Sequence, residues 1–141
     1  KQYAKWYKLK FAITYFYNVY GKNEIAQGKY ATVIAKFLQL KKQRQTHLPI
    51  TSPGTQKRRF THIEDIINGL ILVGKKGIGD DYGIGSNKYY SIIDLANLLK
   101  MKYKLTQAKK GNRMNAMLKT RKIKDLGWKE NNALESYLKQ N

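Results

Sequence analysis

The stretch that decides the fold is residues 53–73, which read PGTQKRRFTHIEDIINGLILV. Pro53 and Gly54 predict a tight turn, because proline fixes φ and glycine accepts a positive φ at little cost. A short polar strand that contains Arg58 and Arg59 follows the turn. Successive side chains of a strand point to opposite faces, so at most one of these arginines lines any single pocket. An arginine beside a loop suits a phosphate, because its planar guanidinium donates two parallel hydrogen bonds.

A helix is predicted directly after this strand. Thr61 followed by Glu64 fits a capping box, in which the hydroxyl and the carboxylate each accept a hydrogen bond from an otherwise unpaired backbone N–H. Apolar residues then recur at helical spacing, and we expect one buried helix face. They are Ile63, Ile66, Ile67, Leu70 and Ile71.

The apolar run FAITYFY at residues 11–17 predicts a strand. It is rich in aromatic and β-branched residues, and its lack of alternation is typical of a strand covered on both faces. Such a strand needs neighbours in a sheet, and the rest of the chain offers only short strands. We therefore expect a partner that lies N-terminal to this sequence.

Four blocks resemble the nucleotide-sugar epimerases and dehydratases of the extended short-chain dehydrogenase family, and they follow the family's order. They are FAITYFYNVYG at 11–21, GTQKRRFTHIEDIINGL at 54–70, DYGIGSNKYYSIIDLANLL at 81–99 and GNRMNAMLKTRKIKDLGW at 111–128. The resemblance implies an α/β fold, namely the C-terminal, substrate-binding part of the extended short-chain dehydrogenase fold. Helices would pack on short strands, and the Rossmann half would be missing.

The resemblance also implies a domain organisation and a function. Residues 1–141 would form one substrate-binding domain, in which residues 1–21 are the tail of the missing dinucleotide-binding domain. The complete protein would be an NAD-dependent UDP-sugar 4-epimerase that binds a nucleotide-diphosphate sugar and forms a homodimer. A nucleotide-sugar 4,6-dehydratase is the alternative within the family. In the family, a Tyr-x-x-x-Lys motif supplies the catalytic base and a glycine-rich βα turn binds NAD. This sequence contains neither, so we expect NAD to bind mainly outside it.

Three residues match positions at which the family contacts its substrate: Asn18, Arg58 and Arg113. Asn18 would touch the sugar or the diphosphate, and the two arginines would clamp the diphosphate. From the residues alone, Asn18 also fits a turn asparagine, and Arg113 also fits an exposed surface arginine. Tyr15 and Arg59 depart from the family, which has arginine and aspartate at these positions.

The composition leaves a second class of function open. The net charge is +19, which suits nucleic acid, but lysines are dispersed along the whole chain and no nucleic-acid-binding motif accompanies them. A small basic nucleic-acid-binding module is therefore the alternative, and a non-catalytic interaction domain of the same fold is a third. No apolar run approaches the length of a membrane span, and a cytoplasmic location is the default. There is no cysteine, and His47 and His62 are too few to predict a metal site.

Overall fold

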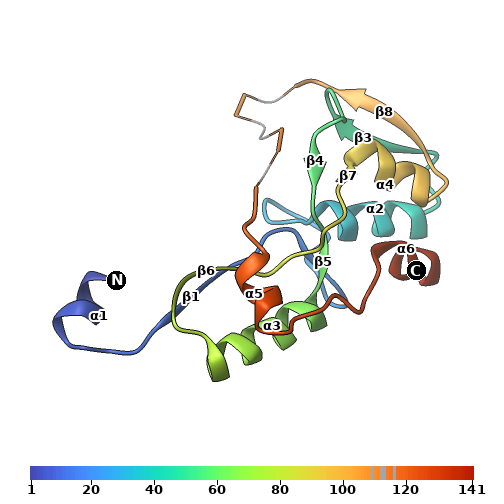
Figure 1. The fold of residues 1–141 in the computed structure, drawn as a ribbon. Helices are drawn as coiled ribbons and strands as arrows, with labels where there is room; N and C mark the ends of the chain where they lie inside the picture. Colours follow the sequence, from blue (N-terminus) through green and yellow to red (C-terminus); the bar gives the residue numbers. More distant parts are fainter. Residues whose placement is uncertain (109, 112–113, 116) are drawn as a thin grey trace.

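The structure is a computed structural model, and it describes residues 1–108, 110–111, 114–115 and 117–141. Helices and short strands alternate along the chain, which confirms the predicted α/β class (Figure 1). The helices are α1 Gln2–Trp6, α2 Val33–Lys42, α3 Ile63–Lys76, α4 Ile92–Leu98, α5 Arg121–Asp125 and α6 Leu134–Gln140. The strands are β1 Ala12–Tyr15, β2 Val19–Tyr20, β3 His47–Thr51, β4 Lys57–Arg58, β5 Thr61–His62, β6 Gly79–Gly83, β7 Tyr90–Ser91 and β8 Lys102–Thr106.

The strands pair two by two in the described part of the chain. β1 with β6, β2 with β5 and β3 with β8 are parallel, whereas β4 and β7 are antiparallel. Parallel neighbours need a crossover between them, and α3 supplies part of the crossover between β1 and β6. The antiparallel pair places Arg58 opposite Tyr90, so the end of β4 is held by the segment that leads into α4.

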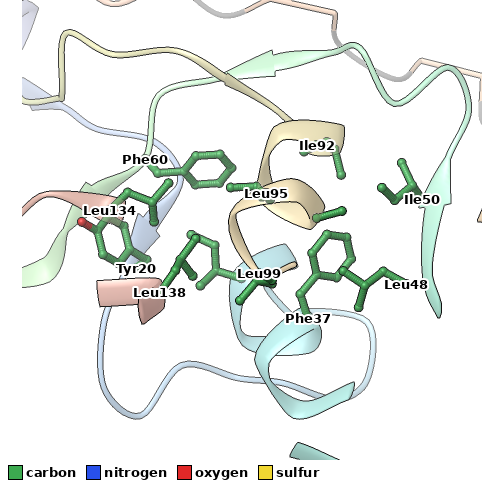
Figure 2. Close-up of a cluster of buried hydrophobic side chains, with 12 residues drawn as sticks. Tyr20, Phe37, Leu48, Ile50, Phe60, Ile92, Leu95, Leu99, Leu134 and Leu138 are labelled. Atoms are coloured by element: carbon green, nitrogen blue, oxygen red, sulfur yellow. The ribbon is translucent and has the colours of Figure 1, made fainter. Parts of the chain in front are cut away.

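The larger hydrophobic core lies where α2, α4 and α6 meet β3 (Figure 2). Phe37 from α2, Leu48 from β3, Leu95 from α4 and Leu138 from α6 are almost completely inaccessible to solvent. Figure 2 shows these side chains converging from different elements, with Phe60 and Tyr20 closing the same cluster. This core fixes the relative positions of α2 and β3, between which the candidate site lies.

A smaller core lies between α3, β6 and α5, and it contains Ile66, Ile84, Ile123 and Trp128. The two-residue strand β2 separates the two cores. Val19 packs against the smaller core, whereas Tyr20 belongs to the larger one. Successive strand residues point to opposite faces, so one short strand contributes to both cores.

Helix α3 forms where it is predicted, but the capping box is wrong. The N-cap residue is His62, whose Nδ1 accepts a hydrogen bond from the backbone N–H of Glu64 at 3.3 Å. Thr61 lies in β5 instead, and its hydroxyl accepts a hydrogen bond from the backbone N–H of Ser86 at 2.9 Å. Pairing of β5 with β2 therefore takes Thr61 out of the cap.

The predicted buried face of α3 is also wrong for most of its members. The helix buries Asp65, Ile66, Gly69 and Val73 against the smaller core. The remaining apolar residues of the predicted stripe lie at least a third exposed on the other side; they are Ile63, Ile67, Leu70 and Ile71. Helix α3 therefore presents a second apolar face that nothing in the described chain covers.

The run 11–17 forms β1 as predicted, but the expected cover on both faces is not present in the described chain. Tyr15, Phe16 and Tyr17 are 38%, 41% and 44% exposed. In the part of the chain that the structure describes, β1 pairs with β6 alone. Helix α1 extends away from the body (Figure 1). Its aromatic side chains are exposed.

Within the described ranges, no helix combines the length and the hydrophobicity that crossing a membrane requires. In the same ranges, no three His, Cys, Asp or Glu side chains are grouped in a way that could hold a metal ion.

Candidate functional site

A cavity of about 750 Å³ opens between α2, β3 and β4. Asn18 and Arg58, two of the residues predicted to contact substrate, both line it. The size falls in the range of ligand-binding clefts, which are mostly apolar with a few placed polar groups. Much of its lining is apolar and includes Val33, Ile34, Phe37, Pro49, Ile50, Phe60 and Ile92.

Arg58 reaches the cavity from the end of β4. Its Nη1 donates hydrogen bonds to the carbonyl oxygens of Lys57 at 2.9 Å and of Met114 at 3.2 Å. The backbone N–H of Lys57 donates to the same Met114 oxygen at 2.9 Å. These contacts tie β4 to the segment near residue 114, and they hold the guanidinium in place at the cavity wall.

Arg59 points away from this cavity, as strand alternation predicts. Its Nη1 donates to the carbonyl oxygen of Leu118 at 3.3 Å, and its Nη2 lies 2.5 Å from the Tyr89 hydroxyl. The guanidinium carbon lies 4.5 Å from the centre of the Tyr89 ring, which is cation–π geometry. Arg59 therefore packs between two loops, while Arg58 lines the cavity.

Asn18 links two strand ends. Its φ is +50°, a conformation that asparagine tolerates better than most residues. Its Nδ2 donates to the carbonyl oxygen of Arg59 at 3.2 Å, and its own carbonyl oxygen accepts from the N–H of Thr61 at 3.3 Å. The Asn18 side chain thus bonds a backbone carbonyl 41 residues away in the sequence, and not the backbone of its own turn. Asn18 also lines the cavity.

The third predicted residue, Arg113, lies outside the described residues. Its neighbours Lys110 and Gly111 line the cavity.

The charge of the cavity comes from Lys36, Arg58, Lys110 and Glu24. Glu24 accepts hydrogen bonds from the N–H of Gly21 at 2.9 Å and from the Thr32 hydroxyl. Thr32 is in turn the N-cap of α2, where its hydroxyl accepts from the N–H of Ala35 at 3.3 Å. Glu24 therefore offsets the positive end of the α2 dipole. Lys36, Arg58 and Lys110 leave the lining of the cavity with a net positive charge.

Sequence reasoning missed several cavity residues, among them Lys36, Thr51 and Gln56. Lys36 lies on an amphipathic helix, and from the sequence its lysines fit a solvent-facing side as well as they fit a cavity. Gln56 follows a turn and precedes a strand of two residues, where a polar side chain is ordinarily exposed. No periodicity marks either residue, so their place in the cavity depends on the packing of α2 against β3.

Tyr20 fixes the strand that follows Asn18. Its ring is buried in the larger core, and its hydroxyl donates to the carbonyl oxygen of Asn132 at 2.9 Å. Burial raises the pKa of the Tyr20 hydroxyl above its ordinary value, because removal from water disfavours the charged phenolate. The phenol therefore stays neutral and keeps donating this bond, which anchors β2 beside the cavity.

The comparisons with known proteins point to one family. The sequence pattern of the NAD dependent epimerase/dehydratase family matches residues 1–85. The dTDP-D-glucose 4,6-dehydratase of Homo sapiens is 31% identical over 143 residues, which cover 92% of this chain and 39% of the human protein.

Solved structures give the same result. The UDP-glucose 4-epimerase of Thermotoga maritima with UDP-glucose superposes with a TM-score of 0.86 at 28% identity, covering 98% of this chain and 46% of that one. The UDP-glucuronic acid 4-epimerase of Bacillus cereus in complex with UDP-glucuronic acid and NAD shares the fold, with a TM-score of 0.84 at 20% identity. That match covers 98% of this chain and 46% of the other.

The chain spans less than half the length of these relatives. The family uses NAD, but this sequence carries no G-x-G-x-x-G turn and no Tyr-x-x-x-Lys pair, so we assign no NAD-binding or catalytic residue within it. In fold and in sequence, the chain matches one part of these larger proteins. It belongs to the NAD-dependent epimerase/dehydratase family and has the corresponding part of the extended short-chain dehydrogenase fold.

Proposed function

We propose that this chain is the substrate-binding portion of an NAD-dependent nucleotide-sugar 4-epimerase that acts on a UDP-sugar. One observation carries the proposal: Asn18 and Arg58, from different strand ends, line one cavity that also contains Lys36 and Lys110. A nucleotide diphosphate combines two phosphates, which need cations and donors, with a flat base, which needs an apolar wall. The cavity offers both kinds of surface.

The work of the chain in this proposal is to position the substrate. Arg58 binds the diphosphate with the two parallel donors of its guanidinium, and Asn18 contacts the diphosphate or the sugar. Arg113 is the second arginine of the clamp. Holding the sugar carbon in a fixed place beside a cofactor can lower a barrier by several kcal/mol (up to about 7–11 in well-oriented systems).

A dinucleotide-binding domain completes the site in this proposal. Residues 1–21 form its tail, and the domain covers the exposed aromatic residues Tyr15, Phe16 and Tyr17 and the exposed apolar face of α3. Two supports lie in this chain: β1 pairs on one edge only within the described residues, and α3 is apolar on both faces. The domain supplies the NAD site and the base, and the complete enzyme is a homodimer.

A 4,6-dehydratase is the second candidate, since the human relative at 31% identity is a dTDP-D-glucose 4,6-dehydratase. Both reactions begin with oxidation of the sugar ring. The two reactions are distinguished by their products. The epimerase forms a sugar with one inverted stereocentre, whereas the dehydratase forms a 4-keto-6-deoxy sugar.

Calorimetric titration of the chain with UDP, inorganic pyrophosphate and duplex DNA tests the proposal. We expect UDP to bind, pyrophosphate to bind more weakly, and Arg58→Ala to weaken both at least tenfold. Arg121→Ala is the matched control, because the Arg121 side chain is 95% exposed on α5. Tighter binding of DNA than of UDP, with a steep salt dependence, would instead establish the nucleic-acid module.

A further inference from the structure

Arg59 is not part of the cavity lining, yet it is connected to both of the described residues that are predicted to contact substrate. Arg58 directly precedes it at the end of β4. The carbonyl oxygen of Arg59 accepts the hydrogen bond from Asn18 Nδ2 at 3.2 Å, so Asn18 holds the backbone of Arg59 from the cavity side. The position of Arg59 therefore affects where the Arg58 side chain points.

The side chain of Arg59 is anchored on the other face of the strand. Its Nη1 donates to the Leu118 carbonyl oxygen at 3.3 Å, and its Nη2 lies 2.5 Å from the Tyr89 hydroxyl, while the guanidinium lies over the Tyr89 ring. Arginine can make these contacts together, because its guanidinium is planar and carries several N–H donors. Aspartate, which the family has at this position, could not donate to the Leu118 oxygen.

The part of the chain that receives this anchor is closely packed. The N–H of Gly83, the last residue of β6, donates to the Lys119 carbonyl oxygen at 3.0 Å. A Cβ on Gly83 would lie 2.3 Å from that oxygen, and a Cβ on Gly85 would lie 2.6 Å from Leu118 Cδ2. Only glycine allows so close an approach. Arg59 therefore connects the end of β4 to a segment that is held firmly against the end of β6.

The burial of Arg59 is not optimal for stability. Its Nε is buried, and no acceptor in the described ranges of the chain bonds it. A buried N–H without an acceptor costs free energy, which reduces the stabilisation that the other contacts of Arg59 provide. Methionine has a side chain of similar length and no such donor. Arg59→Met should therefore keep much of the packing and leave the fold intact.

We propose that Arg59 is a positioning residue for the substrate cavity: its anchor outside the cavity fixes the end of β4 and thereby orients Arg58 towards the ligand. This inference rests on the proposed nucleotide-sugar site. A binding group must be held within about 0.5 Å of its productive position by neighbours whose own side chains are fixed. Arg59 supplies this support to Arg58 without touching the ligand.

A double-mutant cycle between Arg58 and Arg59 tests the proposal. Titration calorimetry measures the affinity for UDP of the wild-type chain, Arg58→Ala, Arg59→Met and the double variant. Arg59→Met alone should weaken UDP binding by about fivefold or more, because Arg58 is no longer held in place. In the Arg58→Ala background the same substitution should change the affinity by less than about twofold, because the residue through which Arg59 acts is gone. Equal losses in both backgrounds would overturn the proposal.

Urea denaturation separates positioning from stability. The urea midpoint of Arg59→Met should stay within about 0.5 M of wild type. A loss of UDP affinity accompanied by a much larger fall of the midpoint would assign Arg59 to stability and overturn its positioning role. Arg121→Met is the matched control, because the Arg121 side chain is 95% exposed, and it should change neither the midpoint nor the affinity.

Hydrogen exchange tests the anchor without any ligand. The N–H of Lys57 in β4 donates to the Met114 carbonyl oxygen at 2.9 Å. In Arg59→Met this amide should exchange about tenfold faster or more, whereas the amides of α2 should keep the wild-type rate. An unchanged rate at Lys57 would overturn the anchor even if UDP binds. If the wild-type chain binds neither UDP nor inorganic pyrophosphate, the proposed function itself fails. If UDP binds but the cycle is additive, only the role of Arg59 fails.

Discussion

The buried carboxylate of Asp65 accepts two hydrogen bonds from Asn132, one from its backbone N–H at 2.9 Å and one from its Nδ2 at 3.1 Å. The N–H of Asn131 donates to the same carboxylate at 3.2 Å. The Asp65 carbonyl oxygen also accepts from the indole N–H of Trp128 at 2.9 Å. One residue in the first turn of α3 thus fixes the segment that leads into α6. Asparagine is a common N-cap residue, and two asparagines precede α6. The N-cap residue is nevertheless Ala133, because Asn131 and Asn132 are both bonded to Asp65.

Asp65→Asn should lower the free energy of unfolding by about 2–3 kcal/mol. The amide has one oxygen where the carboxylate has two, so a buried N–H loses its acceptor. Urea denaturation followed by circular dichroism measures the loss. Asp125→Asn, whose side chain is 69% exposed, should stay within about 0.5 kcal/mol of wild type. Equal stability of the two variants would contradict this role for Asp65.

Two glycines on the same helix should respond oppositely to alanine. A Cβ on Gly69 would lie 2.8 Å from Ile84 Cγ2 and 3.1 Å from Trp128 Nε1, whereas one on Gly74 meets nothing within 4 Å. We expect Gly69→Ala to destabilise by about 1–3 kcal/mol through overpacking. Gly74→Ala should stabilise by about 0.5–1 kcal/mol, because alanine is the better helix former. Thermal and urea denaturation of the pair check both signs, and two changes of the same sign would refute the packing of α3.

Glu135 makes the stability depend on pH. Hydrogen bonds from the Tyr90 hydroxyl and the Lys88 ammonium lower the pKa of Glu135 to about 2, from an ordinary value of 4.5. A depressed folded-state pKa means that the stabilisation is complete above pH 4.5 and is lost as the pH falls towards 2. Denaturation midpoints measured across this window should fall less steeply in Glu135→Gln than in wild type. Asp125→Asn should follow the wild-type curve.

In a complete enzyme, Arg58→Ala and Arg113→Ala should each raise KM for the nucleotide sugar at least tenfold. Loss of one charge-assisted contact to a phosphate costs about 1.5–3 kcal/mol, which is a factor of ten or more in affinity. Steady-state kinetics with Arg121→Ala as the control measures the effect. Wild-type KM values for both variants would rule out the arginine clamp.

Ile67→Lys probes the uncovered face of α3. The side chain is 46% exposed, so in this chain alone the substitution should change the free energy of unfolding by no more than about 0.5 kcal/mol. In a protein that includes the dinucleotide-binding domain, the same substitution should destabilise clearly, because it would bury a charge. Urea denaturation of both forms provides the comparison. An equal, small effect in the two forms would mean that the domain does not cover this face.

Local signals in the sequence predicted the cap of α4 but not the caps of α3 and α6. Ser91 followed three residues later by Asp94 has the spacing of a capping box, and the structure contains it. The Asp94 N–H donates to Ser91 Oγ at 3.0 Å, and the Ser91 N–H donates to Asp94 Oδ2 at 2.7 Å. Both partners lie within one helical turn, so the spacing can identify them; at Thr61 and Glu64 the same spacing fails, because Thr61 is paired in β5. The partners of Asp65 lie 66 and 67 residues away, and no local pattern connects them.

Periodicity also could not decide which face of α3 is buried. The helix is apolar on two sides, and only its neighbours β6 and α5 select the side that contains Ile66. At the candidate site, the family resemblance singled out Asn18 and Arg58, and the structure brings both to one cavity. Gln56 went unnoticed because its burial results from contact with Thr51 and not from any spacing in the sequence.

Strand β2 is only two residues long, yet it couples the two hydrophobic cores. Val19 and Tyr20 enter different cores, so the two cores cannot be repacked independently of each other. A slip of one residue in the pairing with β5 would exchange an aliphatic and an aromatic side chain between the cores and displace Asn18 from the cavity wall. Both hydrophobic cores therefore fix the register of this two-residue strand. A substitution that disturbs the packing of either core also displaces Asn18, the asparagine predicted to contact substrate.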